Sequence, residues 1–209
     1  YDKFSAEDDW SKTKGRLVVD WQFTDYAMTY FSFATGYKSG GFDGQSFRSF
    51  AAGSFDPEEM TSYELGLKGD FLDETLRLEA ALFHHELDGK QTSTDVKDGP
   101  DDPTAAPGVI SSDEEADGIE LVVTWSVTDT LRLGALTTYR ESDDVSQLYY
   151  NAAGDLVGGE NESGETNTEY TLKLDWTPQV AYGYLLLHMN YEFREDPGPD
   201  ETTAISTTG

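Results

Sequence analysis

The fold follows from one stretch, Ser62-Tyr63-Glu64-Leu65-Gly66-Leu67-Lys68-Gly69-Asp70-Phe71. Its larger apolar side chains share one parity and its charged side chains the other, which is typical of a strand with one apolar face. After residues 72–75 a second run alternates in the same way, with Leu76, Leu78, Ala80 and Leu82 on one side. The two runs therefore predict a β-hairpin.

The register of this hairpin is a sharp prediction. Pairing Phe71 with Leu76 sets Asp70 opposite Arg77 and Lys68 opposite Glu79, so that both polar pairs have opposite charges. Such cross-strand pairs contribute about 0.2 to 1 kcal/mol each. A slip of one residue would turn every side chain to the wrong face. We expect the charged face to lie in water and the apolar face to be covered by protein or by lipid.

Three further hairpins show the same alternation. Their strands are expected at residues 11–21, 26–37, 119–125, 131–139, 170–176 and 185–193. The last two strands are expected to join across a turn near residues 177–180. Because the tight turns resemble one another, the chain is interpreted as a repeat of hairpins.

Short and long connections alternate along the chain. Short turns follow Trp21, Phe71, Trp125 and Trp176, and long polar segments follow the returning strands. Residues 88–117 and 141–167 are expected to be acidic loops in which no strand persists. All 7 prolines are predicted to lie outside the strands, because proline cannot donate a ladder hydrogen bond.

Three segments resemble the barrel region of TonB-dependent outer-membrane receptors. They are Gly36-Tyr37-Lys38-Ser39-Gly40-Gly41-Phe42, Pro57-Glu58 and Ser62-Tyr63-Glu64-Leu65-Gly66-Leu67-Lys68. The resemblance runs from about Trp10 to Arg194. It implies active uptake of a scarce nutrient, such as a ferric siderophore, cobalamin or a glycan, through a barrel of about 22 strands.

The resemblance also implies a domain organisation. No plug domain, TonB box, signal peptide or final strand is recognised, so residues 1–209 are expected to be an internal to C-terminal part of a receptor barrel. The TonB complex would then act through an N-terminal part that this sequence lacks. The expected location is the bacterial outer membrane.

A lipid bilayer explains the pattern as a whole. The predicted fold class is all-β: an antiparallel up-and-down transmembrane β-barrel segment of about eight strands with short periplasmic turns and long extracellular loops. Trp21, Phe71, Trp125 and Trp176 would form a periplasmic aromatic girdle in contact with lipid. Two alternatives remain open at this point, a small stand-alone barrel and a soluble β-sandwich, either acting as a binding or structural module.

Composition limits the possible functions. The net charge is −27 with only 14 Lys and Arg residues, which argues against nucleic acid as a partner. The chain has no cysteine, and no catalytic set can be assembled, so neither an enzyme nor a cofactor is expected. His84 and His85 are adjacent in a strand, so they are predicted to point to opposite faces and not to share a metal. The acidic segments lack the spacing of a calcium loop, so no metal site is predicted.

Ligand contact is expected in residues 37–54. This segment supplies Tyr37, Lys38, Phe42 and Arg48 to a chain that is otherwise poor in cations. An anionic small molecule such as an iron chelate would favour Lys38 and Arg48. The alternative is that the aromatic side chains only pack the loop against its neighbours.

Overall fold

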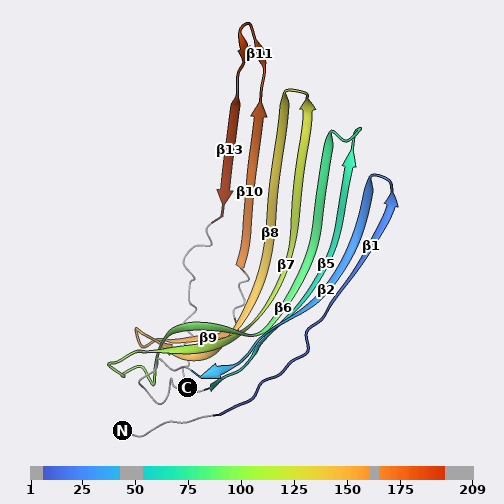
Figure 1. Ribbon diagram of the computed structural model, residues 1–209. Coiled ribbons are helices and arrows are strands. Elements are labelled where there is room, and N and C mark those ends of the chain that lie inside the picture. Colours follow the sequence, from blue (N-terminus) through green and yellow to red (C-terminus); the bar gives the residue numbers. More distant parts are fainter. Residues whose placement is uncertain (1–6, 43–53, 161–164, 196–209) are drawn as a thin grey trace.

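A single antiparallel sheet dominates the computed structural model, which describes residues 7–42, 54–160 and 165–195 (Figure 1). Strands that follow one another in sequence lie side by side in the sheet. Its strands, in spatial order, are β1 (Arg16–Thr24), β2 (Ala27–Lys38), β5 (Glu58–Phe71), β6 (Leu76–Lys97), β7 (Ala106–Thr128), β8 (Leu131–Asn151), β10 (Glu165–Trp176) and β13 (Leu187–Arg194). The predicted all-β, up-and-down architecture is confirmed.

Five short strands complete the described fold. They are β9 (Leu156–Glu160), which pairs with β8, then β3 (Gly41–Phe42) with β4 (Ser54–Phe55), and β11 (Gln179–Val180) with β12 (Gly183–Tyr184). Within the described ranges there is no helix long and apolar enough to span a membrane.

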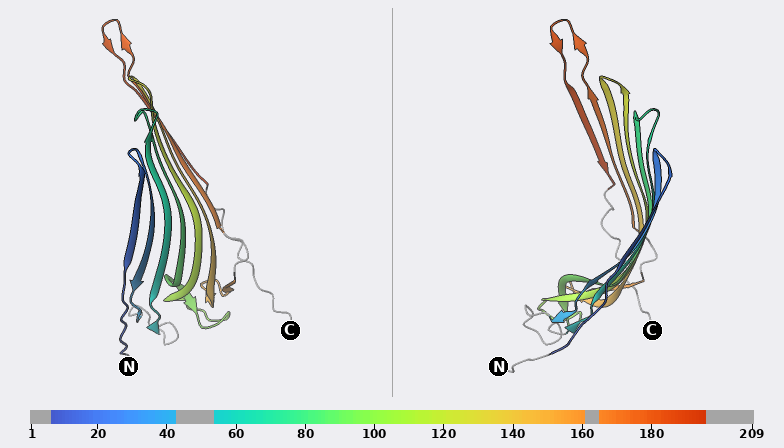
Figure 2. Two further views of the ribbon diagram at one scale, coloured as in Figure 1. Left: turned by 90° about the vertical axis from the view of Figure 1, so that its right-hand side faces the viewer. Right: turned by 45° about the vertical axis from the view of Figure 1, so that its right-hand side comes forward.

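The sheet is one curved layer (Figure 2). Among the described residues, β1 and β13 form its two edges and do not pair with each other, so this stretch of wall is open. The β-sandwich alternative is wrong for this part of the chain, because the other sheets among the described residues, β3–β4 and β11–β12, have only two strands each and form no second layer over the main sheet. The closed eight-stranded barrel is wrong for the same part because its edges do not meet.

The central hairpin has the predicted register. Phe71 lies opposite Leu76, Asp70 opposite Arg77 and Lys68 opposite Glu79. Lys68 Nζ lies 3.4 Å from Glu79 Oε2. The Arg77 guanidinium donates to Glu79 at 3.1 Å along its own strand rather than to Asp70.

Two of the predicted long loops are largely wrong. β6 continues to Lys97 and β7 begins at Ala106, and β8 continues to Asn151 before β10 begins at Glu165. The backbone ladder extends through these segments because strand pairing uses main-chain N–H and C=O groups and does not require alternating apolar side chains. A small cluster of Val96, Ala106, Ile110 and Tyr149 packs where these extended strands meet.

Three smaller expectations also need correction. The first strand begins at Arg16 rather than at residue 11. Pro107 lies inside β7, opposite Asp95 of β6, where β8 does not pair with β7 and no ladder hydrogen bond is lost on that side. The last turn is longer than predicted, because the β10–β13 ladder stops at the pair Trp176 and Leu187, and residues 177–186 form a separate projection.

Glycines on the polar side of the sheet accommodate aromatic rings. A Cβ atom on Gly66 would lie 2.1 Å from the Tyr30 ring, and one on Gly118 would lie 2.1 Å from the Phe83 ring. The Tyr30 hydroxyl donates to Glu64 Oε1 at 2.5 Å, so the ring is fixed across its glycine. These close approaches explain why glycine stands inside strands that otherwise favour larger side chains.

Replacing Gly66 by Ala should destabilise the protein by about 1 to 3 kcal/mol, because the added methyl group displaces the Tyr30 ring. The urea midpoint of the intact protein in detergent measures this effect. Gly99→Ala is the matched control, since a Cβ there meets nothing within 4 Å. Equal midpoints for the two variants would contradict the proposed packing.

Candidate functional site: the two faces of the barrel wall

The ladder register sorts side chains onto two faces. We call the face that carries Leu65 and Leu82 the apolar face, and the face that carries Glu64 and Lys68 the polar face. The turn end of the sheet holds the short connections at residues 25–26, 72–75 and 129–130, and the loop end is the opposite one.

We call a row of residues that pair with one another across neighbouring strands a rung. One rung of the apolar face has an apolar side chain on each of six neighbouring strands. It consists of Val19, Phe31, Leu65, Leu82, Ile119 and Tyr139. These side chains are between 40% and 54% exposed. A continuous apolar surface of this extent is a liability in water and marks a surface that meets lipid or protein.

The four aromatic residues predicted to form a girdle share this face. Trp21, Phe71, Trp125 and Trp176 each lie near the turn end of their strand. The register places Phe71 and Trp125 on one rung with Leu76 between them. Trp176 pairs with Leu131 and Leu187, two residues nearer the turn end.

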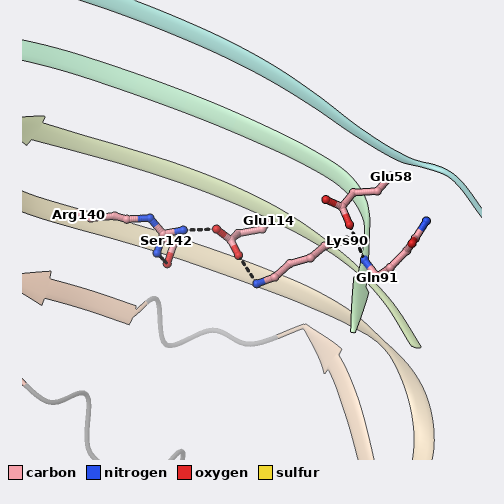
Figure 3. Close-up of polar contacts among 6 residues, drawn as sticks. All are labelled: Glu58, Lys90, Gln91, Glu114, Arg140 and Ser142. Carbon is pink, nitrogen blue, oxygen red and sulfur yellow. Dashed lines mark hydrogen bonds and ion pairs between the residues drawn. The ribbon is translucent and has the colours of Figure 1, made fainter. Parts of the chain in front are cut away.

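The polar face carries an ionic cluster near the loop end (Figure 3). Glu114 of β7 accepts a hydrogen bond from Lys90 Nζ of β6 at 2.6 Å, and its other oxygen pairs with the Arg140 guanidinium of β8. The Arg140 guanidinium also donates to Ser142 Oγ at 3.0 Å. One carboxylate whose side chain is only 15% exposed therefore ties three strands together. We call Lys90, Glu114, Arg140 and Ser142 the Glu114 cluster.

Gln91 forms a second polar junction beside this cluster. Its backbone N–H donates to Glu58 Oε2 at 3.0 Å (Figure 3). Its side-chain amide donates to the carbonyls of Ser39 and Asp56 at 3.1 and 3.0 Å. These bonds join β6 to the segments that flank β3 and β4.

Asp144 is a titratable group at the loop end whose pKa is shifted. It lies opposite Glu114 on the polar face and is half-buried. Burial raises the pKa of the Asp144 carboxyl, and the nearby Lys90 charge and Ser112 hydroxyl offset only part of this effect. The carboxylate charge is therefore less favourable here than in water.

The structure does not gather the four predicted ligand residues at one point. Lys38 Nζ lies 3.3 Å from Glu58 Oε2 on the polar face, whereas Tyr37 precedes it and points to the opposite face, beside Glu59. The Phe42 ring packs 5.8 Å from the Trp10 ring. Arg48 lies outside the described residues.

The two adjacent histidines point to opposite faces, as predicted. His84 contacts Asp117 Oδ1 at 2.9 Å, and the His85 ring stacks 4.8 Å from the Phe83 ring. Within residues 7–42, 54–160 and 165–195, no three metal-binding side chains are arranged to hold an ion.

Sequence reasoning missed the Glu114 cluster because its members fall in or beside segments interpreted as loops. A signal was present, since Lys90 and Arg140 are isolated cations at the edges of strongly acidic segments. Only the register across β6, β7 and β8 shows that they converge on one carboxylate.

A curved antiparallel sheet with one exposed apolar face and one polar face is the wall of a transmembrane β-barrel. The chain matches the family described as "TonB dependent receptor-like, beta-barrel" over residues 1–208, and it belongs to that family. This confirms the resemblance found in the sequence. Members of this family are receptors rather than enzymes.

Two similar proteins support this assignment. The chain is 28% identical over 163 residues to the "Probable TonB-dependent siderophore receptor PiuA" of Acinetobacter baumannii, a match that covers 68% of this chain and 21% of that protein. It also resembles the crystal structure of the ferric yersiniabactin uptake receptor FyuA from Yersinia pestis, with a TM-score of 0.61 and 20% identity over 86% of this chain and 25% of that one. The chain thus spans about a fifth of the length of the curated relative.

Replacing Asp144 by Asn should raise the stability of the intact protein at pH 7. Because the folded-state pKa is raised, the stabilising contribution of Asp144 is present below its ordinary pKa of about 3.9 and is lost as the pH rises through the folded value. The gain from Asn should therefore shrink as the pH falls towards about 4.

Urea midpoints at several pH values measure this dependence. Asp143→Asn serves as the control, because Asp143 is exposed and lies on the opposite face. The same pH-dependent gain in stability in both variants would show that the loss of one negative charge from an acidic protein, rather than the burial of Asp144, is responsible.

Proposed function

We propose that the intact protein is an outer-membrane transporter that imports a scarce nutrient, with a ferric siderophore as its cargo. The observation that carries this proposal is the unbroken apolar rung across six strands, backed by a polar face with an ionic cluster. Lipid satisfies the apolar face, and a water-filled lumen satisfies the polar one.

The four aromatic residues support this orientation in the membrane. The six strand-to-strand steps from β1 to β10 can be followed through the paired residues. Measured towards the turn end, Phe71 lies four residues beyond the residue aligned with Trp21, Trp125 is aligned with Phe71, and Trp176 lies two residues beyond the residue aligned with Trp125. The total offset of six residues is about 20 Å along the strands, and the six strand spacings are about 29 Å across them. The line of aromatic residues is therefore inclined by about 35° to the perpendicular of the strands, which matches the tilt of strands in transmembrane barrels. Strands tilted by this amount in the matching sense bring Trp21, Trp125 and Trp176 to one depth, and Phe71 lies two residues nearer the turn end, as expected for a periplasmic girdle of finite thickness.

The loop end would then lie outside the cell. β6, β7 and β8 extend well past the apolar rungs there (Figure 1), and most of the residues in these extensions are polar. We infer that residues 1–209 are one part of the barrel wall. The plug and the contact with TonB belong to other parts of the receptor.

The cargo is proposed from the relatives and from residue chemistry. One similar protein is named as a siderophore receptor and the other as a ferric yersiniabactin uptake receptor. In a chain with 41 acidic residues and 14 basic ones, Lys38 and Arg48 are cations that could attract an anionic chelate. Lys38 is suited to this role because its side chain is 58% exposed despite its contact with Glu58.

Growth of a deletion strain on a panel of ferric siderophores, cobalamin and oligosaccharides tests the proposed function. We expect a growth defect on at least one ferric siderophore under iron limitation, and restoration by the intact gene. Normal growth on every iron chelate combined with a defect on another nutrient would reject the cargo, and no defect on any nutrient would reject uptake.

Replacing both Lys38 and Arg48 by Ala should weaken binding of the identified chelate by about tenfold or more, because two fixed cations are lost. Barrel yield should not change. Lys97→Ala is the control, since it removes a different cation, the last residue of β6. Unchanged affinity in the double variant would remove Lys38 and Arg48 from the ligand site.

A further inference from the structure

A small hairpin projects from the turn end of β10 and β13. It consists of the paired strands β11 and β12, joined through Ala181 and Tyr182, and it continues past the last pair of the main ladder (Figures 1 and 2). Leu185 N–H donates to the Pro178 carbonyl at 3.0 Å, which closes its base. The other turns at this end have no such extension in the described structure.

The surface of this hairpin is apolar and uncovered. Tyr182 is fully exposed and Leu186 is 70% exposed. The other exposed apolar side chains are Val180, Tyr184 and Leu185. In water, no contact would offset the free-energy cost of exposing this apolar surface.

The hairpin also lacks charge in a chain that is otherwise highly charged. From Trp176 to Tyr191 the sequence contains no Asp, Glu, Lys or Arg, although the chain has 41 acidic and 14 basic residues. The other three turns each contain acidic residues, which are Asp25, Asp73 with Glu74, and Asp129. The last turn thus differs in chemistry as well as in length.

The hairpin is continuous with the apolar face. It begins directly after the pair Trp176 and Leu187, whose rung belongs to that face. Lipid that contacts Trp176 therefore reaches the base of the hairpin. A protein partner would be expected to meet polar or charged groups around an apolar centre, and residues 177–186 provide no charge for such a rim.

We propose that residues 178–186 form a lipid anchor that lies in the boundary between headgroups and acyl chains of the periplasmic leaflet. Tyr182 and Tyr184 suit this depth because each combines an apolar ring with a hydroxyl that stays hydrated. Leu185 and Leu186 supply apolar area towards the acyl chains. The proposal rests on the membrane placement of the sheet and not on the identity of the cargo.

The backbone sets the depth of the anchor. The hairpin has only two ladder pairs, Gln179 with Tyr184 and Val180 with Gly183. Its outer N–H and C=O groups therefore need water, and full burial in the hydrocarbon would cost several kcal/mol per group. The anchor therefore stops at the interface instead of crossing the bilayer.

Site-directed spin labelling of the intact protein tests this proposal in phosphatidylethanolamine and phosphatidylglycerol vesicles. A nitroxide is attached at Tyr182→Cys, with Leu186→Cys as a second site should the first variant not fold, and no native cysteine of this chain competes for the label. Leu65→Cys on the apolar face is the lipid control, and Asp73→Cys in the β5–β6 turn is the water control.

The expected result is a label at position 182 that collides readily with oxygen and rarely with a water-soluble nickel chelate, at a depth of about 5 to 10 Å below the phosphate plane. A label that resembles the one at position 73 overturns the anchor, as does an immobilised label shielded from both reagents, which would indicate a docked protein. A water-exposed label at position 65 would instead reject the membrane placement itself, so the two failures are distinguishable.

Discussion

The register that pairs Phe71 with Leu76 is the constraint on which the rest of this structure depends. Because side chains alternate between faces along every strand, one pairing fixes which residues of all neighbouring strands share a face. It aligns apolar side chains from Val19 to Tyr139 across six strands. A shift of one residue would turn Glu64 and Lys68 to the apolar face, and in lipid a lysine costs about 2 to 4 kcal/mol near the midplane.

A local departure from this register organises the polar side of the wall. The β6–β7 ladder shifts between Leu87 and Lys90, which turns Lys90 to the polar face. Lys90 there meets Glu114 and Arg140 at the loop end, where the apolar face no longer contributes. There the extended strands are held by backbone pairing, by the Glu114 cluster and by the small packing cluster around Val96 and Ala106. An exposed apolar face distinguishes one end of the wall, and hydrogen bonds and ion pairs hold the other.

The sequence predicts the part of the fold in which the two faces differ in polarity. The central hairpin, its charge pairs and the up-and-down order follow from alternation alone, since one face must be apolar and the other polar. The extensions of β6, β7 and β8 could not be found in this way, because both of their faces are rich in polar residues and the alternation disappears. The last turn was predicted too short because the sequence pattern does not show that the chain pairs again at Gln179 and Tyr184.

Cysteine scanning along residues 119–124 of β7 tests the orientation of the wall most directly. In the intact protein in vesicles, a membrane-impermeant maleimide with access to the lumen should modify cysteines at the even positions 120, 122 and 124, which share the polar face. Cysteines at the odd positions 119, 121 and 123 should remain unmodified until the bilayer is dissolved. Equal reactivity at both parities, or the reverse pattern, would contradict a wall with lipid on its apolar face.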